Sequence, residues 1–431
     1  MPPSELFDAL LGPSVGDTEL LQAILDVEAA LARAAAEAGV LPSDHAEAIA
    51  AVCEARRFDV AELARATRLA GNPAIAVVAA LTALAPAGAR GSVHIGGTSQ
   101  DIVDNALQLI VQRRRVRIDA HLDHVGTATV TLAERHRSTL MAGRTLMQHA
   151  LPITFGLKAA QWLAGVTDSR RRLRQHVLTV QFGGAAGTLA SLGSTAVAAT
   201  MRRSLAAHLG LADAPLPWPT ARAQVASLGS TLAIACGSLA KMALDVELLM
   251  QTEVAELFEV AAIGKGISST LPHKRNPVSA VSIRAAHQQA VGLASTLLFA
   301  MAQEHERAAG AWQGEWEPLM GLLRLAEGAA AQAADMVEGL EIDIERMRTN
   351  LDLTGGRVLA EAIVTALRPA LGRDGADAVV RAAAAQPGPL RANLPATPEV
   401  AALGDTPFDP AHYLGSTDSF IDYALADWRS L

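Results

Sequence analysis

Residues 264–277 read GKGISSTLPHKRNP and separate two long stretches of helical pattern. The segment holds two glycines, two prolines, three adjacent hydroxyl side chains, one histidine and three cationic side chains. A connection between packed helices usually needs about two to eight residues. A segment this long and polar in an Ala- and Leu-rich chain is typical of a functional loop. Composition alone leaves a solvated basic loop as the alternative.

The order of these residues resembles the signature loop of the fumarase/aspartase superfamily, G-S-S-x-M-P-x-K-x-N-P. Its ending, PHKRNP, is similar to that of adenylosuccinate lyases and 3-carboxy-cis,cis-muconate cycloisomerases. Six positions match: Ser268, Ser269, Pro272, Lys274, Asn276 and Pro277. Two positions differ, with Ile267 in place of glycine and Leu271 in place of methionine. The first matters more, because a β-branched residue cannot easily adopt the backbone angles open to glycine.

Composition limits the class of protein. Half of the 431 residues are apolar, 3% are aromatic and 19% are charged, which suits packed helices with small side chains at their contacts. The net charge of −8 argues against a nucleic acid as the default partner. Cys53 and Cys236 have neither metal-site spacing nor a disulfide framework, which favours the reducing cytoplasm. The first residues show no basic, then apolar, signal-peptide pattern.

Residues 223–240 and 285–303 raise the question of membrane spans. Neither range contains an acidic or basic residue other than histidine. A helix that is apolar on nearly all sides is either a membrane span or the centre of a large bundle. Polar Gln, Ser, Thr or His side chains interrupt both ranges, so we favour the bundle and expect no membrane association.

The periodic pattern predicts an all-α protein with three helical domains over residues 1–107, 108–350 and 351–431. In the first domain, a helix is expected to end at Gly39 and the next to begin at Pro42-Ser43-Asp44. Residues 224–260 contain no proline, and if fully helical they would span about 55 Å at roughly 1.5 Å per residue. The superfamily resemblance implies the same three-domain fold, with long central helices in a bundle.

Residues 91–107, GSVHIGGTSQDIVDNAL, are expected to lead into a helix near Ser99 or Gln100. Thr98 or Ser99 could be an N-cap, with Asp101 in the first turn. That reading leaves His94, the glycines and the second hydroxyl unexplained. The string resembles the superfamily's H-x-G-x-T-S-x-D region. The resemblance implies that His94 is an active-site residue and that Thr98 and Ser99 bind substrate.

Residues 143–156, GRTLMQHALPITFG, resemble the superfamily's second conserved region. Fumarases and adenylosuccinate lyases read G-R-T-H there, and that histidine is catalytic. This chain has Leu146 at the position. The cycloisomerases also lack the histidine and continue with Q-H-A, as this chain does at Gln148 and His149. A histidine in an apolar helix is more often a core residue, but the resemblance favours a catalytic His149, with Thr145 and Gln148 as substrate donors.

Two further stretches resemble the cycloisomerases. In residues 181–193, QFGGAAGTLASLG, the glycines would each cost up to about 1 kcal/mol inside a helix, which predicts a break or a close backbone approach. Residues 216–222, LPWPTAR, partly match their W-H-T-x-R-D motif. Trp218, Thr220 and Arg222 agree, whereas Pro219 and Ala223 replace a histidine and an aspartate.

The resemblance implies abstraction of a proton next to a carboxylate, coupled to loss or gain of a group at the neighbouring carbon. Ser268 takes the position of the catalytic base, and Lys274 and Asn276 supply donors for the carboxylate that accumulates charge. Ser269 either binds substrate or shapes the loop. Asn276 and Pro277 also suit a helix N-terminus, and Lys265 is expected to be solvated.

Together these motifs predict a cycloisomerase of the 3-carboxy-cis,cis-muconate family, acting on a small polycarboxylate without metal or cofactor. The resemblance further implies a homotetramer whose active sites are shared between subunits. The alternatives are another lyase of the superfamily, cleaving a C–N or C–O bond in a succinate derivative, and a catalytically silent structural homologue.

Overall fold

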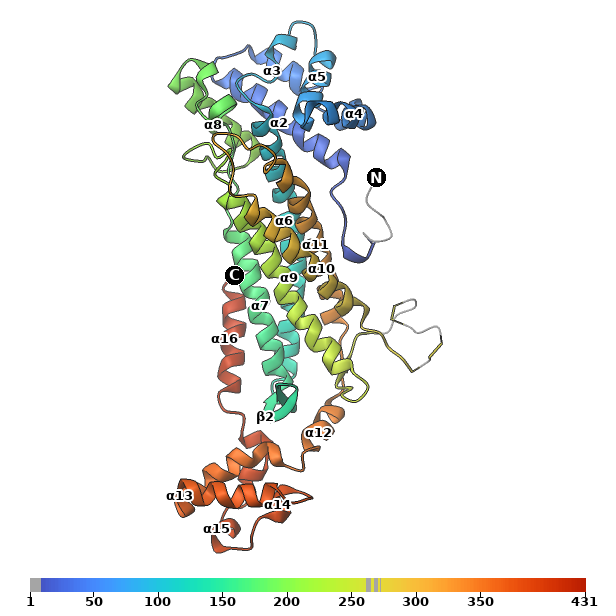
Figure 1. Ribbon diagram of the computed structural model, residues 1–431, viewed down its shortest axis with the longest axis vertical. Helices are drawn as coiled ribbons and strands as arrows, with labels where there is room; N and C mark the ends of the chain where they lie inside the picture. Colours follow the sequence, from blue (N-terminus) through green and yellow to red (C-terminus); the bar gives the residue numbers. More distant parts are fainter. Residues whose placement is uncertain (1–8, 261–264, 267–269, 272) are drawn as a thin grey trace. The chain divides into compact units, whose positions relative to one another are not determined.

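The computed structural model describes residues 9–260, 265–266, 270–271 and 273–431 and is built mainly of helices (Figure 1). This confirms the predicted all-α fold. Ser268 and Ser269 lie outside the described residues, as do Ile267 and Pro272. In the described part, no helix is long and apolar enough to cross a membrane.

The chain divides into two compact units. The first contains residues 1–120, 171–236 and 285–329, and the second contains residues 121–170, 237–284 and 330–431. All five division points fall inside long helices: α6 (Ser99–Arg135), α7 (Phe155–Gln175), α9 (Ala223–Met250), α10 (Val278–Phe299) and α11 (Trp316–Glu338). The division into three domains that the sequence predicts stays a prediction.

The first unit also contains shorter helices, of which α2 packs against α3 and α8. α2 is followed by Gly39, whose φ of +72° is left-handed, so the predicted helix end is confirmed. α3 begins at Ser43, also as predicted. The helices are α2 (Asp17–Glu37), α3 (Ser43–Ala50), α4 (Val60–Ala70), α5 (Pro73–Leu84), α8 (Thr195–Leu209) and the 3-10 turns Ala55–Arg57, Arg90–Ser92, Gly184–Ala186 and Ala190–Leu192.

The second unit contains two short antiparallel pairs of strands, β1 with β2 and β3 with β4. Its C-terminal helices pack around a small core that includes Ile363, Leu367 and Val380. The last helix of this unit is α16. The elements are β1 (Leu140–Thr145), β2 (Gln148–Thr154), β3 (Leu257–Phe258), β4 (Glu341–Ile342), α12 (Ile344–Asp352), α13 (Ala360–Ala384), α14 (Leu390–Asn393), α15 (Pro398–Ala401) and α16 (Thr417–Arg429).

Two stretches depart from the helical pattern. Residues 140–154 lie within the region 108–350, for which the sequence indicates long helices, but they form a β-hairpin whose turn residues, Leu146 and Met147, have φ angles of 49° and 66°. Two positive φ angles in succession are the geometry of a tight hairpin turn. The proline-free stretch of residues 224–260 is helical only as far as Met250, and Ala255, with φ 51°, leads the chain into β3.

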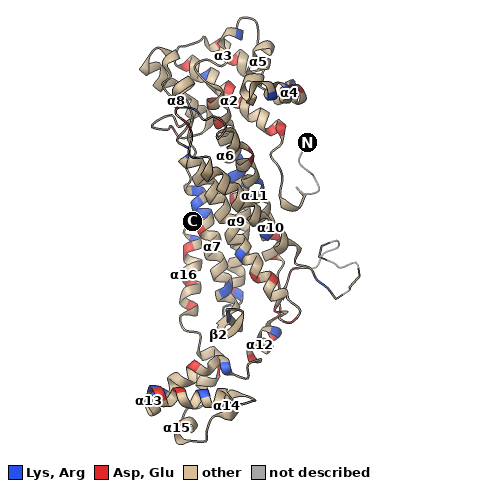
Figure 2. Cartoon of the chain, in the orientation of Figure 1, with Lys and Arg blue, Asp and Glu red and all other residues tan. Residues whose placement is uncertain are grey.

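Charged side chains of both signs occur along the described helices. Figure 2 shows Asp and Glu interspersed with Lys and Arg over the helices of the described chain. Many of them form ion pairs, such as Arg174 with Asp119 in the first unit and Arg137 with Asp422 in the second. Surface pairs of this kind contribute little to stability, about 0–1 kcal/mol each. The ion pairs that matter for the site are buried ones.

Candidate functional site

The segment before α6 is organised by Asp101. Its carboxylate accepts hydrogen bonds from the backbone N–H of Thr98 at 3.1 Å, of Gly183 at 3.0 Å and of Gly184 at 2.9 Å. The amide of Gln181 donates a fourth, at 3.0 Å. α6 begins at Ser99, as predicted, and Asp101 in its first turn receives the Thr98 N–H. Asp101 therefore ties the predicted substrate-binding hydroxyls to the glycine-rich stretch.

The glycines of that stretch are needed for close approach, as predicted. A Cβ atom on Gly183 would lie 2.9 Å from the Cβ of Pro217, and Gly184 has a φ of +66°. Asp101 is 1% exposed, and this burial raises the pKa of its carboxyl to about 6, although the hydrogen bonds from Gly184, Gly183, Thr98 and Gln181 oppose the rise.

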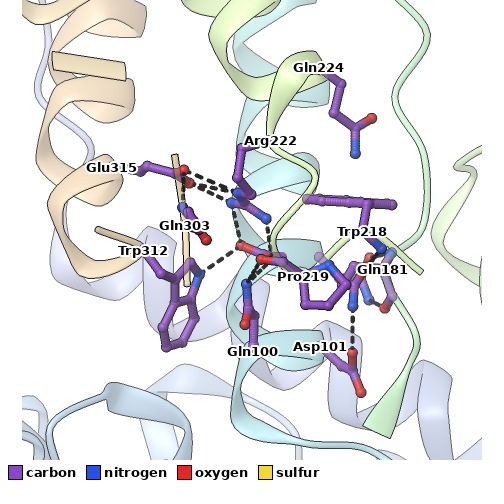
Figure 3. A network of polar contacts seen from close by, with 12 residues as sticks. Gln100, Asp101, Gln181, Trp218, Pro219, Arg222, Gln224, Gln303, Trp312 and Glu315 are labelled. Carbon is purple, nitrogen blue, oxygen red and sulfur yellow. Dashed lines mark hydrogen bonds and ion pairs between the residues drawn. The ribbon is translucent and has the colours of Figure 1, made fainter. Parts of the chain in front are cut away.

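One turn further along α6, Asp104 belongs to a buried ion-pair network with Arg222 and Glu315, the two residues of it that Figure 3 labels. Arg222 donates to Asp104 at 2.7 and 3.0 Å and to Glu315 at 2.5–3.1 Å. The indole of Trp312 donates to Asp104 at 3.0 Å, and the Arg222 guanidinium lies 4.9 Å from the ring centre of Trp218. Arg222 thereby connects α6 with the segments that precede α9 and α11.

Gln100 continues this network. Its amide nitrogen donates to the Pro219 carbonyl at 2.7 Å, and its oxygen accepts from Arg307 at 2.7 Å. Arg307 also donates to the carbonyls of Gly184 and Ala185, at 3.1 and 2.9 Å. Pro219, which replaces the histidine of the cycloisomerase pattern, takes part in this network through its backbone carbonyl. Hydrogen bonds with three separate parts of the chain thus hold the backbone around Thr98 and Ser99.

His94 is held from α2. Its Nδ1 lies 2.7 Å from Oε1 of Glu28, whose side chain is 1% exposed. His94 has a left-handed φ of 62°, an unfavourable conformation for a residue with a side chain. Such strain persists only where the surroundings hold it.

In the second unit, the hairpin presents Thr145 opposite Gln148, and Arg144 opposite His149. Arg144 donates to the fully buried Glu256 at 3.0 and 2.5 Å, which holds β1 in place. Leu146 lies in the turn with 96% of its surface exposed. His149 is therefore on a strand, and the core-helix alternative considered for it does not apply.

The surroundings of His149 favour the neutral form of its imidazole. Partial burial and the neighbouring Arg144 guanidinium lower its pKa below the ordinary value, while Glu256 opposes them. Its Nδ1 is buried and has no hydrogen-bond partner among the described residues. A neutral imidazole with an unused nitrogen can accept or deliver a proton once substrate is bound.

The loop that contains the signature segment is joined at its base. The N–H of Asn276 donates to the carbonyl of Gly266 at 2.9 Å, and a Cβ on Gly266 would lie 2.7 Å from the Asn276 oxygen. The carboxylate of Glu259 accepts from the N–H groups of Ser279 and Ala280, at 3.1 and 2.9 Å. Glu259, rather than the Asn276 side chain, thus receives the second and third N–H groups of α10, while the first, that of Val278, donates to the Asn276 carbonyl.

The comparisons with known proteins agree with one another. A protein-family model described as "Lyase" matches residues 12–292. The chain is 45% identical to a 3-carboxy-cis,cis-muconate cycloisomerase from Pseudomonas aeruginosa, with 100% of this chain and 98% of the relative covered.

The chain belongs to the fumarase/aspartase superfamily. The crystal structure of a 3-carboxy-cis,cis-muconate lactonizing enzyme from Pseudomonas putida matches with a TM-score of 0.92, at 41% identity and 99% coverage of both chains. A nitrosuccinate lyase from Streptomyces davaonensis is 44% identical and covers 96% of this chain and 91% of its own. The superfamily membership predicted from the signature loop is confirmed.

Within this superfamily chain, the predicted site residues fall into groups. His94, Thr98 and Ser99 share one segment of the first unit. Thr145, Gln148 and His149 share the hairpin of the second unit. Lys274 and Asn276 belong to the same unit but lie outside the hairpin. Lys274 is exposed. Ser268 and Ser269 lie outside the described residues, so their roles stay predictions. Among the described residues, no cluster of three or more His, Cys, Asp or Glu side chains could hold a metal ion.

Several supporting residues were missed from the sequence. Lys265 was expected to be solvated, but its Nζ lies 3.9 Å from Glu259. The other missed residues are buried charges in apolar stretches, a pattern that signals a polar network. Asp101 and Asp104 are three residues apart and so share a helix face, which the sequence could have shown. These buried charges are Glu28, Asp104, Glu256, Glu259 and Glu315, and the partly exposed Arg307 was missed as well.

Proposed function

We propose that this chain is a 3-carboxy-cis,cis-muconate cycloisomerase that interconverts the tricarboxylate and its γ-lactone. The observation that carries the proposal is the hairpin turn. Leu146 occupies the position of the catalytic histidine of fumarases and adenylosuccinate lyases and is exposed, whereas the Gln148-His149 pair of the cycloisomerases follows on β2. The full-length similarity to cycloisomerases bears out this prediction from the sequence.

In the lactonising direction, a substrate carboxylate oxygen adds to a carbon–carbon double bond and an acid delivers a proton to the adjacent carbon. In the reverse direction, a base removes that proton and the lactone C–O bond breaks. Both directions pass through a species with extra negative charge on a carboxylate, which fixed donors stabilise. We assign the base role to Ser268 and proton transfer to His149 as its companion.

The remaining predicted residues bind the carboxylates. Lys274 and Asn276 face the carboxylate that gains charge, and Thr98, Ser99, Thr145, Gln148 and Ser269 supply neutral donors. We also assign His94 to the binding of substrate. Because these residues come from segments far apart in the chain, we propose a homotetramer in which different subunits complete each site. The exposed apolar side chains of α10, Val281, Val291, Leu298 and Phe299, support such an assembly.

We also place the enzyme in the cytoplasm and assign it no metal or cofactor. The two cysteines, Cys53 and Cys236, are free and buried, which suits a reducing compartment. The predicted chemistry uses side chains alone.

The test is an ultraviolet assay with 3-carboxy-cis,cis-muconate, run in parallel with fumarate, adenylosuccinate and nitrosuccinate. Lactonisation removes the conjugated diene, so absorbance falls as product forms. We expect turnover of the muconate at least about a hundredfold above that of the other three, since a site built for one polar substrate rejects analogues strongly. Equal or greater turnover of another compound contradicts the proposal.

A second candidate is a lyase that cleaves a C–N bond in a substituted succinate. The 44% identity to the nitrosuccinate lyase over 96% of this chain favours it. Both reactions place a negative charge next to a carboxylate, so the same donors serve either. In the assay above, rapid turnover of nitrosuccinate without turnover of the muconate would select this candidate.

A further inference from the structure

Glu28 is a buried carboxylate in an apolar helix. It lies on α2 among Leu25, Val27, Ala29 and Leu31, all of them buried. Oε1 of Glu28 pairs with His94, while Oε2 is buried and has no hydrogen-bond partner among the described residues. An ionised carboxylate is costly to bury unless a cation or several donors face it. The balance of charge at this point therefore depends on His94.

The backbone of His94 is arranged to reach Glu28. The positive φ of His94 and of Gly96, 62° and 78°, turn this segment sharply before α6. With Nδ1 directed at the carboxylate, the proton on Nδ1 is fixed, and Nε2 is the nitrogen left for another partner. The imidazole remains 22% exposed, against 1% for the glutamate. The pair thus has a buried anionic end and an accessible end.

Two acidic groups of the described residues act on this imidazole: Glu28 from α2 and Asp101 from α6. Burial alone would lower the pKa of His94, but the hydrogen bond and charge of Glu28, with the charge of Asp101, raise it above the ordinary value. The hydrogen bond to Glu28 and the neighbouring negative charges therefore both favour the protonated form of His94. Protonating His94 compensates the buried carboxylate and places a cation on the segment that also carries Thr98 and Ser99, the predicted substrate-binding residues.

We propose that Glu28 is a positioning residue that holds His94 as an imidazolium, and that the Nε2–H of this cation binds a carboxylate of the substrate. The inference rests on the proposed polycarboxylate substrate. A neutral imidazole could offer a similar hydrogen bond, but a charge-assisted one is about twice as strong. Glu28 thereby acts on the substrate through His94, without touching it.

Glu28→Gln is the decisive variant, because it keeps the shape and one acceptor oxygen but removes the charge. Glu37→Gln is the matched control, since Glu37 lies on the same helix and its Oε1 pairs with Nε2 of His208 at 2.9 Å, on a more exposed surface. Melting temperature and circular dichroism establish that both variants fold. We expect Glu28→Gln to raise the KM about tenfold or more, with kcat within about twofold, since hydrogen bonds to charged groups contribute more than neutral ones. Glu37→Gln should leave both constants unchanged.

A second readout does not depend on turnover. The protein is labelled with ¹³C at histidine Cε1, and the His94 resonance is assigned by its loss in His94→Asn. We expect the wild-type resonance to titrate above the free value of about 6.5 and the Glu28→Gln resonance to titrate lower. Propane-1,2,3-tricarboxylate serves as an unreactive probe, and it should shift the His94 resonance and bind Glu28→Gln more weakly, as measured by calorimetry.

The outcomes separate the two proposals. Absence of turnover with the muconate, together with the expected titration and probe binding, overturns the proposed reaction and supports the Glu28–His94 inference. The inference is overturned if wild-type His94 titrates at or below about 6.5, or if Glu28→Gln leaves the titration unchanged. It is also overturned if the titration falls but KM and probe affinity stay at wild-type values, because His94 then carries charge without using it to bind.

Discussion

Arg222 donates two hydrogen bonds to Asp104, at 2.7 and 3.0 Å, and neither side chain is more than 2% exposed. The same guanidinium also faces Glu315, so one buried cation serves two buried carboxylates. Removal of one partner from a buried ion pair leaves an uncompensated charge, which costs far more than the intact pair contributes.

Arg222→Ala is therefore expected to lower the free energy of unfolding by about 3–5 kcal/mol, because it leaves Asp104 and Glu315 buried without their cation. Urea unfolding measures the change. Arg381→Ala is the control, since its pair with Asp377 is largely exposed and should cost no more than about 1 kcal/mol. Equal free energies of unfolding for the two variants would show that the buried network contributes no more to stability than an exposed ion pair.

Asp101 predicts a dependence of stability on pH. Its folded-state pKa of about 6 is above the ordinary 3.8, so between these values the folded chain binds more protons than the unfolded chain. The contribution of this titration is largest below about pH 4 and falls as pH rises to about 6, by about 3 kcal/mol. Unfolding of the wild type is compared with that of Asp101→Asn, which does not titrate, from pH 4 to 7. The free energy of unfolding of the wild type minus that of Asp101→Asn should decrease as the pH rises toward 6. A difference that stays constant with pH would contradict the raised pKa.

Shared sites predict complementation between inactive subunits. His149→Ala and Ser268→Ala should each be inactive, and mixing them under conditions of subunit exchange should restore part of the activity, because some hybrid sites then hold both residues. Light scattering gives the assembly state, for which we expect four subunits. A fully active monomer, or mixtures without any recovered activity despite exchange, would exclude shared sites.

Ser268 and Lys274 should differ in kinetics. Ser268→Ala is expected to lower kcat by about 10²–10⁴-fold with little change in KM, as loss of a general base does. Lys274→Ala should also raise KM, because it removes a charge partner from the ground and transition states alike. Steady-state kinetics distinguish the two. If Ser268→Ala keeps a near-normal kcat in a folded protein, the base lies elsewhere, and His149 is the first residue to test.

Local signals predicted much of the fold. The helix end at Gly39 and the helix start at Ser99 follow from glycine and capping signals alone. The hairpin of residues 140–154 was missed because its turn uses Leu146 and Met147 in a conformation that sequence normally marks with Asn or Gly. Contacts distant in the sequence decide such cases.

The site follows the same division. The motifs name candidates for the residues that carry the chemistry, from His94 to Asn276, because each motif is local, and their roles stay predictions. The contacts that hold this region, from Glu28 to the candidate His94 and from Arg307 to the supporting Gln100, join residues 66 and 207 positions apart. No local pattern links such positions, so only the folded chain shows them.

The closed base of the signature loop bears on how this enzyme could acquire new substrates. Gly266 is joined to Asn276, and Glu259 to the first turn of α10, by hydrogen bonds at described residues on either side of the segment. The entropic cost of closing a loop grows only slowly with its length. Because these hydrogen bonds hold both ends of the segment, positions between Gly266 and Asn276 other than the predicted catalytic and binding residues can change while the helical scaffold keeps its register, so selectivity can evolve with little cost in stability.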